Sequence, residues 1–417
     1  MKKQLNRWIY AVVGVIALIF AGLIYAWSVL SSPLSTVHNG PWADSSLTWT
    51  STIVMMFFCL GGFFGGMLQK KLKVRYEMWI AAVLLLVGFA LASVSKSIIM
   101  MYLGFGLLAG LGAGFAYNAV MSSVSKWFPD KQGLISGIQL MGFGIGSFII
   151  GKIYTAIVDA DNTGEGTSWT TCFLILGIIC FVVIGAAGFF TAKPDAGYKV
   201  PGMEKPGKAK SAPYEEVTTP QMLKRSSFWF MFIWAILVSV AGLAVIFLGR
   251  PIAVSAVPNL DPSSVATVVG LISIFNGIGR IIFGALFDKI GYKLTLVIDC
   301  IVFIIAMIII LLALSSHSVV ILYISYIVTG LAYGGVTPSQ SAFVNKFYGS
   351  ENYPTNFSIM VMNLLIASFG TKLADAVQTA TGSYTVVIYG VIGLCVLAGI
   401  CALLIRKPNT AQAKAQK

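Results

Sequence analysis

Charged residues are scarce in this chain of 417 residues: 10% are charged, whereas 57% are hydrophobic and the mean hydropathy is +0.87. Soluble domains carry about 25% charged residues, so the composition excludes a soluble fold. Repeated apolar runs of about 20 residues are long enough to cross a bilayer as helices. The sequence therefore predicts an all-α, multi-pass protein embedded in a lipid bilayer.

Residues that carry catalysis or bind metals are also few. The two histidines, His38 and His317, fall in predicted external loops. The six cysteines lie in apolar runs without the spacing of metal ligands, and no nucleotide-binding fingerprint or nucleophile set is present. The sequence thus argues against an enzyme and predicts no metal and no cofactor.

Acidic residues number only fifteen, and nearly all fall in predicted loops or near the ends of apolar runs. Asp299 is the exception that lies clearly inside a run. Glu77, at the start of another run, is interpreted as an interfacial residue. An ionisable group within the bilayer is costly and usually functional, which makes Asp299 the candidate proton-carrying residue.

Twelve apolar runs are predicted to span the membrane, in two sets of six. A polar stretch that contains Pro194, Pro201, Pro206, Pro213 and Pro220 separates the sets and resembles a linker. We therefore predict an N-terminal six-helix bundle over 1–192, a cytoplasmic linker over 193–225 and a C-terminal six-helix bundle over 226–417. The predicted spans are 8–30, 47–69, 77–95, 99–122, 132–158, 169–191, 226–249, 264–287, 293–315, 318–340, 354–377 and 383–405.

The net charge of +13 reflects topology rather than nucleic-acid binding. Nearly all lysines and arginines fall on one predicted side of the membrane. Only Lys96, Lys152, Arg250 and Lys372 fall on the other side, and Arg280 lies within a span. Cytoplasmic loops carry such an excess of positive charge, so both termini are predicted to be cytoplasmic. We expect a location in the plasma membrane and no nucleic-acid partner.

The two halves of the chain repeat one another. Gly114-Phe-Ala-Tyr117 recurs 216 residues later as Gly330-Leu-Ala-Tyr333, and Gly66-Met-Leu-Gln-Lys-Lys71 recurs 218 residues later as Gly284-Ala-Leu-Phe-Asp-Lys289. Matches at nearly one offset indicate an internal repeat. Paired repeats of this kind are typical of carriers in which one bundle rocks against the other.

Arg280 is the most informative residue, because it places a permanent positive charge within a predicted span. Such a charge costs at least about 3 kcal/mol in lipid, so we expect it to face a polar cavity and to bind an anion. Asn276 lies one helical turn earlier on the same face. The pair offers a fixed cation and a neutral amide to one space.

Two loop motifs are similar to those of a known family. Gly284-Ala-Leu-Phe-Asp-Lys-Ile-Gly-Tyr-Lys293 resembles the signature after the eighth span of the major facilitator superfamily. Lys126-Trp-Phe-Pro-Asp-Lys-Gln-Gly133 resembles the loop between spans four and five of its oxalate/formate antiporter family and monocarboxylate-transporter relatives. The resemblance covers nearly the whole chain and implies two pseudo-symmetric six-helix bundles.

The resemblance also implies roles for individual residues. Arg280 falls on the family's carboxylate anchor, and Tyr25, Tyr117 and Tyr333 match tyrosines that line the family's central cavity. Their hydroxyl groups can donate to a carboxylate while their rings exclude water. Three residues of the eighth-span loop are predicted to form a conformational latch. They are Gly284, Asp288 and Lys289.

Two departures from the family narrow the predicted substrate. The oxalate carriers have a lysine in span eleven, but Ile359–Gly370 contains no cation here; Asn363 is the polar residue of that segment and is predicted to contact the substrate. Lys372 lies nearer the outer end, beside Asp375. One buried cation balances one negative charge, which favours a monocarboxylate. Animal monocarboxylate carriers place an aspartate where this chain has Asn276, so Asp299 is left as the proton candidate.

The sequence thus predicts a secondary active transporter of small monocarboxylates, of the lactate, pyruvate and formate class. Alternating access would proceed by proton symport or by anion exchange, and the carrier is expected to work as a monomer. Two alternatives stay open. One is a dicarboxylate antiporter of the oxalate/formate type, and the other is a membrane sensor that binds a carboxylate without transporting it.

Overall fold

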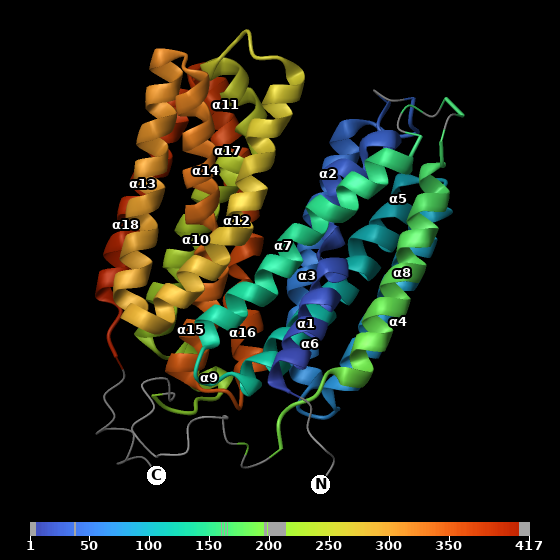
Figure 1. The fold of residues 1–417 in the computed structure, drawn as a ribbon, viewed down its shortest axis with the longest axis vertical. Helices are drawn as coiled ribbons and strands as arrows, with labels where there is room; N and C mark the ends of the chain where they lie inside the picture. Colours follow the sequence, from blue (N-terminus) through green and yellow to red (C-terminus); the bar gives the residue numbers. More distant parts are fainter. Residues whose placement is uncertain are drawn as a thin grey trace. The chain divides into compact units, whose positions relative to one another are not determined.

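The computed structural model is helical almost throughout. It describes residues 6–36, 39–159, 161, 163–164, 166–195, 198 and 214–407. Within these residues, eleven helices are long and apolar enough to cross a membrane. The predicted all-α membrane fold is confirmed (Figure 1).

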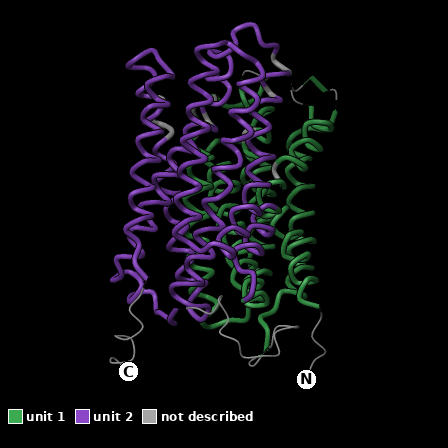
Figure 2. The backbone as a smooth tube through the Cα atoms, turned by 60° about the vertical axis from the view of Figure 1, so that its left-hand side comes forward, with its two compact units in different colours: residues 1–129, 142–206 green, residues 130–141, 207–417 purple. Residues whose placement is uncertain are grey.

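The chain divides into two compact units, which Figure 2 shows in green and purple. Unit 1 comprises residues 1–129 and 142–206, and unit 2 comprises residues 130–141 and 207–417. The division falls within α7 (Gln132–Ile157), so the start of this helix belongs to unit 2 and the remainder to unit 1. The predicted bundles, 1–192 and 226–417, would keep α7 whole, and they stay a prediction.

Unit 1 contains α1 to α6, α8 and most of α7. Within unit 1, the most extensive helix–helix contacts are those of α4 with α8 and of α3 with α6. Helix α1 also packs on α6 and α8. The helices are α1 (Arg7–Ala21), α2 (Trp27–Leu30), α3 (Asp44–Leu68), α4 (Val74–Ser93), α5 (Ile98–Met101), α6 (Gly110–Val124) and α8 (Trp169–Phe190), with short helical segments η1 (Gly22–Ala26), η2 (Ser32–Leu34), η4 (Tyr102–Ala109) and η5 (Ser125–Trp127).

Unit 2 contains the remaining helices and repeats the packing of unit 1. The pair α12 and α14 corresponds to α3 and α6, and the pair α13 and α18 corresponds to α4 and α8. The helices are α9 (Thr219–Leu223), α10 (Ser226–Phe247), α11 (Gly249–Ala256), α12 (Pro262–Ile290), α13 (Tyr292–Ser316), α14 (Val319–Gly334), α15 (Val336–Tyr348), α16 (Tyr353–Val361), α17 (Asn363–Thr381) and α18 (Tyr384–Leu404).

Glycines at matching repeat positions set the spacing of these helices. In unit 1, a Cβ on Gly114 of α6 would collide with the carbonyl oxygen of Phe58 in α3. In unit 2, a Cβ on Gly330 of α14 would lie 2.6 Å from the carbonyl oxygen of Ile272 in α12. Small residues let backbones approach closely where lipid removes the hydrophobic driving force between helices. The repeated motif that ends in Tyr117 and Tyr333 is thus a packing device as well as a sequence pattern.

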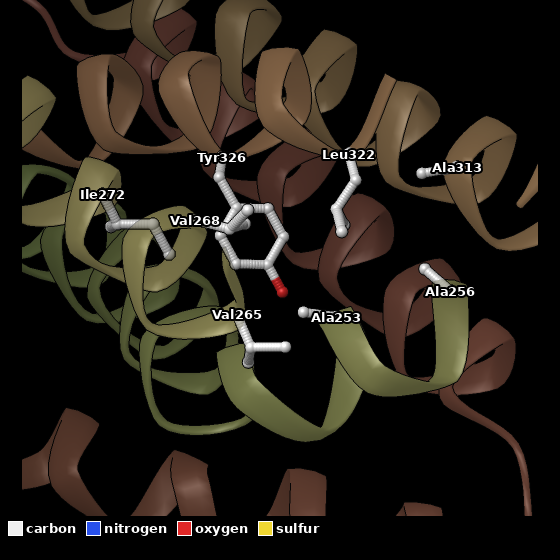
Figure 3. Close-up of a cluster of buried hydrophobic side chains, with 8 residues drawn as sticks. All are labelled: Ala253, Ala256, Val265, Val268, Ile272, Ala313, Leu322 and Tyr326. Carbon is white, nitrogen blue, oxygen red and sulfur yellow. The ribbon is translucent and has the colours of Figure 1, made fainter. Parts of the chain in front are cut away.

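Unit 2 also has a core of apolar side chains where α11, α12, α13 and α14 meet (Figure 3). Tyr326 of α14 is fully buried in it, and its hydroxyl group donates to the carbonyl oxygen of Gly249 at the start of α11. A buried tyrosine normally satisfies its hydroxyl in this way. This contact fixes α11 against α14 beside the first turns of α12, the helix that carries Arg280.

Four of the predicted spans are interrupted or longer than expected. Span four runs from Ile98 to Trp127 and span ten from Val319 to Tyr348, because the polar residues of their last turns are buried in protein. Span one passes through the 3-10 segment η1. Span eleven is divided at Met362 into α16 and α17. The part of this span that the structure describes is not among the eleven helices.

The end of the predicted linker packs against unit 2. The backbone N–H of Tyr214 donates to Lys346 at 2.8 Å, and that of Val217 donates to Tyr348 at 3.1 Å. Glu216 accepts hydrogen bonds from the backbone of Ser350 and Glu351. Residues 199–213 of the linker lie outside the described residues.

Candidate functional site

Arg280 lies near the middle of its span. Helix α12 runs from Pro262 to Ile290, so about 15 Å of helix separates Arg280 from the Ile290 end. The helix begins at Pro262. Asp261 comes directly before it, and its side chain accepts a hydrogen bond from the backbone N–H of Ser264 at 2.9 Å. It continues three residues beyond the predicted edge at 287.

The guanidinium group of Arg280 is held by neutral oxygen atoms of unit 2. Its Nε donates to Oδ1 of Asn276 at 2.8 Å, and one terminal nitrogen donates to the carbonyl oxygen of Leu140. Asn276 is buried, with 9% of its surface exposed, while Arg280 is partly buried. The predicted pairing of the two side chains on one helical face is therefore seen, and the amide fixes the direction of the guanidinium plane.

Leu140 belongs to the first part of α7, which packs against α12 through glycines. A Cβ on Gly137 would collide with the carbonyl oxygen of Arg280, and a Cβ on Gly133 would collide with that of Gly284. A chain of hydroxyl groups continues the contact, from Ser136 through Ser341 to Tyr353, with oxygen–oxygen distances of 2.6 and 2.7 Å. The anchor therefore lies on a tightly packed helix–helix seam.

Asp288 stabilises the start of α7. Its two carboxylate oxygens accept hydrogen bonds from the backbone N–H groups of Gly133 and Leu134, at 3.0 and 2.9 Å. A negative charge at a helix N-terminus also opposes the helix dipole. Gly284 packs on Gly133, and Lys289 is exposed to solvent. This is the geometry from which a latch would be built, although its role as a latch stays a prediction.

Tyr333 lies in the last turn of α14, close to the anchor. Its ring packs against Gly242 of α10, where a Cβ would collide with it. The next residue, Gly334, packs on the backbone of Asn276 and Arg280. The end of α14 that carries Tyr333 therefore lies close to the anchor within unit 2.

Tyr25 and Tyr117 come together in unit 1 around a phenylalanine. The ring of Phe143 in α7 lies 5.3 Å from that of Tyr25 and 5.2 Å from that of Tyr117, and Phe58 of α3 completes the group. Tyr25 is 39% exposed, whereas Tyr117 is only 4% exposed. Sequence reasoning missed Phe58 and Phe143, because a phenylalanine in an apolar helix carries no signal that separates it from other packing residues.

Asn363 joins α17 to α10. Its Nδ2 donates to the carbonyl oxygen of Ala235 at 3.2 Å and to Oγ of Ser239 at 2.9 Å. Its Oδ1 has no hydrogen-bond partner in the described chain. The amide hydrogens are thus used within the bundle, and only the carbonyl oxygen could serve a ligand. The side chains of Lys372 and Asp375 lie outside the described residues, and so does His38.

Two buried carboxyl groups stand out, one in each unit. Asp299 in α13 is fully buried, and Glu77 in α4 is 1% exposed. Neither oxygen of Asp299 has a hydrogen-bond partner in the described chain, whereas the side chain of Gln69 interacts with Glu77. The side chain of Glu77 packs against Gly65 of α3, inside the protein, and its interfacial depth stays a prediction. The position of a residue near the start of a span does not reveal which way its helix face points.

In the first repeat Lys70 takes the place of Asp288, and Gln69, one residue earlier, makes contacts within unit 1. Its Nε2 donates to Oδ1 of Asn118 at 3.2 Å and to Oγ of Ser122 at 2.7 Å, both in α6. An amide can donate in this way, whereas a carboxylate cannot. Gln69 therefore gives the end of α3 a fixed contact with α6 in its own unit.

Comparison with known proteins agrees with this architecture. The sequence profile of the Major Facilitator Superfamily matches residues 9–371. The chain belongs to the Major Facilitator Superfamily. The residue motifs that resembled this superfamily are thereby supported, and the fold of two related six-helix bundles is that of its transporters.

Relatives within the superfamily include carriers of small acids. The chain is 26% identical to an uncharacterized MFS-type transporter, YhjX, of Escherichia coli, over 88% of this chain and 86% of the relative. It is 24% identical to the oxalate:formate antiporter of Oxalobacter formigenes, over 90% of this chain and 86% of the relative. A shorter match, over 34% of this chain and 28% of the relative, reaches 30% identity with mouse monocarboxylate transporter 12.

Solved structures of superfamily members share the fold. A double tryptophan mutant of XylE matches with a TM-score of 0.75 at 12% identity, over 98% of both chains. An outward-facing bacterial homologue of ferroportin matches with a TM-score of 0.70 at 13% identity, over 96% of this chain and 99% of that chain. The protein is thus a multi-span membrane transporter of the superfamily.

Proposed function

We propose that this transporter carries small monocarboxylates by alternating access, with Arg280 as the carboxylate anchor. The observation that carries the proposal is the Arg280–Asn276 pair within the hydrophobic part of α12. A guanidinium group presents parallel N–H donors that match both oxygens of a carboxylate. Tyr333 would add a hydroxyl group, since it precedes Gly334, which packs on the backbone of both anchor residues.

The names of the relatives point to the same chemical class. They include an oxalate:formate antiporter, monocarboxylate transporter 12 and, over 60% of this chain, an apicoplast pyruvate carrier of Toxoplasma gondii. Each named substrate is a small organic anion. A carboxylate would replace the carbonyl oxygen of Leu140 as the acceptor for the terminal N–H groups of Arg280.

Charge balance favours a monocarboxylate over a dicarboxylate. The segment Ile359–Gly370, where oxalate carriers of the resembled family have a lysine, contains no cation. Asn363 fills that region with a neutral amide that already donates to α10. A dianion at Arg280 would keep about one charge unmatched in a low-dielectric site, at a cost of several kcal/mol.

A proton can be carried by Asp299. Its side chain is fully buried without a hydrogen-bond partner, and a buried ionised carboxylate without partners is strongly unfavourable. The neutral carboxyl group is therefore the form that fits this structure. Symport would couple its ionisation to transport, whereas an exchanger would leave it protonated throughout.

The proposed setting is the plasma membrane, with both termini cytoplasmic and a monomer as the working unit.

Counterflow in proteoliposomes tests this function. Liposomes loaded with unlabelled lactate should accumulate labelled lactate, and formate, acetate or pyruvate inside should support the same exchange. Preferential exchange of oxalate would instead identify a dicarboxylate antiporter. Saturable binding in detergent, with no counterflow of any of these anions, would identify a sensor and contradict transport.

A further inference from the structure

Span ten is weakened at two adjacent glycines, Gly334 and Gly335. Helix α14 ends at Gly334 and α15 begins at Val336. The N–H of Gly335 bonds to the carbonyl oxygen of Ala332, three residues back, at 2.9 Å. Pro338 has no N–H with which to bond the carbonyl oxygen of Gly334. Glycine pairs and prolines are the usual sites of helix kinks, so this junction is a natural hinge.

Gly334 packs directly on the anchor. A Cβ there would collide with the carbonyl oxygen of Asn276 and would lie 2.8 Å from the backbone nitrogen of Arg280. The hinge therefore touches α12 at the turn that carries both anchor residues. Tyr333 lies one residue earlier in the chain, with its ring against Gly242 of α10.

Gly335 packs on the buried acid. A Cβ there would collide with Oδ1 of Asp299 and would lie 2.8 Å from the ring of Phe283. The two glycines thus lie between the anchor on α12 and the carboxyl group on α13. If the carboxyl group of Asp299 needs more space, it must push on Gly335. The same short segment contacts Arg280 through Gly334.

The surroundings of Asp299 offer nothing to stabilise a charge. The titratable groups near it are the thiols of Cys300, on its own helix, and Cys395, on α18. In the described chain, α12 and the α14–α15 junction present Phe283 and Gly335 to it, and neither oxygen has a hydrogen-bond donor. Ionisation therefore requires local opening that admits water or a donor.

We propose that the Gly334–Gly335 hinge couples proton occupancy of Asp299 to carboxylate binding at Arg280. Loss of the proton opens the packing at Gly335, and the movement of α15 against α14 shifts Gly334 and Tyr333 relative to the anchor. Proton and substrate affinities then depend on each other reciprocally. This inference rests on the proposed function, because it assigns a regulator to the proposed anchor.

Asp299→Asn keeps the shape of the protonated acid and removes its titration. We expect the variant to retain lactate counterflow at equal pH on both sides. The wild type should show a KM for lactate that changes at least about fivefold between pH 5.5 and 8, whereas the KM of the variant should stay constant. An inward proton gradient should drive accumulation in the wild type only.

Gly335→Ala tests the hinge itself. Its methyl group must displace the Asp299 carboxyl group, so we expect counterflow to fall at least about fivefold. Adding Asp299→Ala should make room for the methyl group and restore counterflow without restoring proton-driven accumulation. Gly393→Ala in α18, where a Cβ meets no atom within 4 Å, is the matched control. Thermal unfolding in detergent checks that each variant is folded.

Three results would overturn the coupling. They are a wild type indifferent to pH, an Asp299→Asn variant that keeps proton-driven accumulation, and a double variant no more active than Gly335→Ala alone. Each of these results is compatible with normal counterflow by the wild type at equal pH on both sides. None of them therefore contradicts the proposal that Arg280 is the anchor. Failure of the anchor would appear separately, as normal counterflow by Arg280→Gln.

Discussion

At the scale of single residues, the geometry of the guanidinium group is decisive. Arg280 uses Nε for Asn276 and a terminal nitrogen for Leu140, which a lysine cannot reproduce with one ammonium group. Arg280→Lys keeps the charge and loses the planar fork. We expect the KM for lactate to rise about tenfold or more, measured by initial rates of counterflow. A KM equal to that of the wild type would show that charge alone suffices.

Asn276 is the second residue whose chemistry can be tested directly. Its Oδ1 lies 2.8 Å from Nε of Arg280, so Asn276→Asp would place a negative charge on the anchor. An ionised aspartate would compete with the substrate, and its protonation at low pH would release the anchor. We expect counterflow to be weak at pH 8 and to recover as the pH falls.

The control for this variant is Asn276→Ser, which cannot titrate. Its counterflow should follow the pH dependence of the wild type. An Asn276→Asp variant as active at pH 8 as the wild type would contradict the contact between this side chain and the anchor.

Residue identity alone predicted part of this site. Arg280 and Asn276 could be predicted as a pair because helical periodicity puts residues four apart on one face. The contact with Leu140 could not, since a backbone carbonyl group has no signature in sequence. The burial of Glu77 was missed for a related reason, because composition near a span end does not reveal the partner helix.

At the scale of helices, Asp288 joins the end of α12 to the start of α7. Its carboxylate accepts from the backbone of Gly133 and Leu134. Asp288→Ala removes both acceptors, and the loss of such a cap costs about 1 kcal/mol. We expect amide hydrogens in the first turn of α7 to exchange about fivefold faster in lipid nanodiscs. Lys289→Ala, in the next position, is exposed and should leave this exchange unchanged.

Lys193, just beyond the end of α8, gives a test of stability against pH. Partial burial, together with the charge of Lys126, lowers its pKa from the ordinary 10.5 to about 8, although Glu77 acts in the opposite direction. The folded protein therefore binds fewer protons than the unfolded chain between about pH 8 and 10.5. Stability should rise with pH across that window, because the charged amine is disfavoured in the fold.

Lys193→Met removes this cost while it keeps most of the side-chain volume. We expect a rise in Tm of about 2 °C at pH 7, which shrinks as the pH approaches 10.5. Thermal unfolding in detergent at a series of pH values measures it. A Tm difference that is independent of pH would show that packing, and not charge, dominates at this position.

The course of the helices was predicted better than their interruptions. Apolar runs of membrane length placed eleven of the twelve predicted spans close to helices that could cross a membrane, because length and hydropathy are fixed by the bilayer. The division of span eleven at Met362 and the hinge at Gly334–Gly335 depend on packing against neighbouring helices. Hydropathy does not register such contacts, and it also ended span ten too early, before the buried polar residues of α15.

At the scale of the whole molecule, the repeat connects sequence to mechanism. The motif around Gly114 and Gly330 predicted two related halves, and both glycines set a helix crossing of the same kind. What the repeat could not predict is the asymmetry between them. Unit 2 carries Arg280, Tyr333 and Asp299, whereas unit 1 contributes Tyr25 and Tyr117 around Phe143.

The most direct test of the account is lactate counterflow by Arg280→Gln beside the control Arg250→Gln. Both variants lose one arginine, but Arg250 is an exposed residue of α11. We expect counterflow by Arg280→Gln to fall at least about a hundredfold, because a neutral amide cannot hold a carboxylate away from water. Arg250→Gln should transport like the wild type. Normal counterflow by Arg280→Gln would contradict the assignment of the carboxylate anchor.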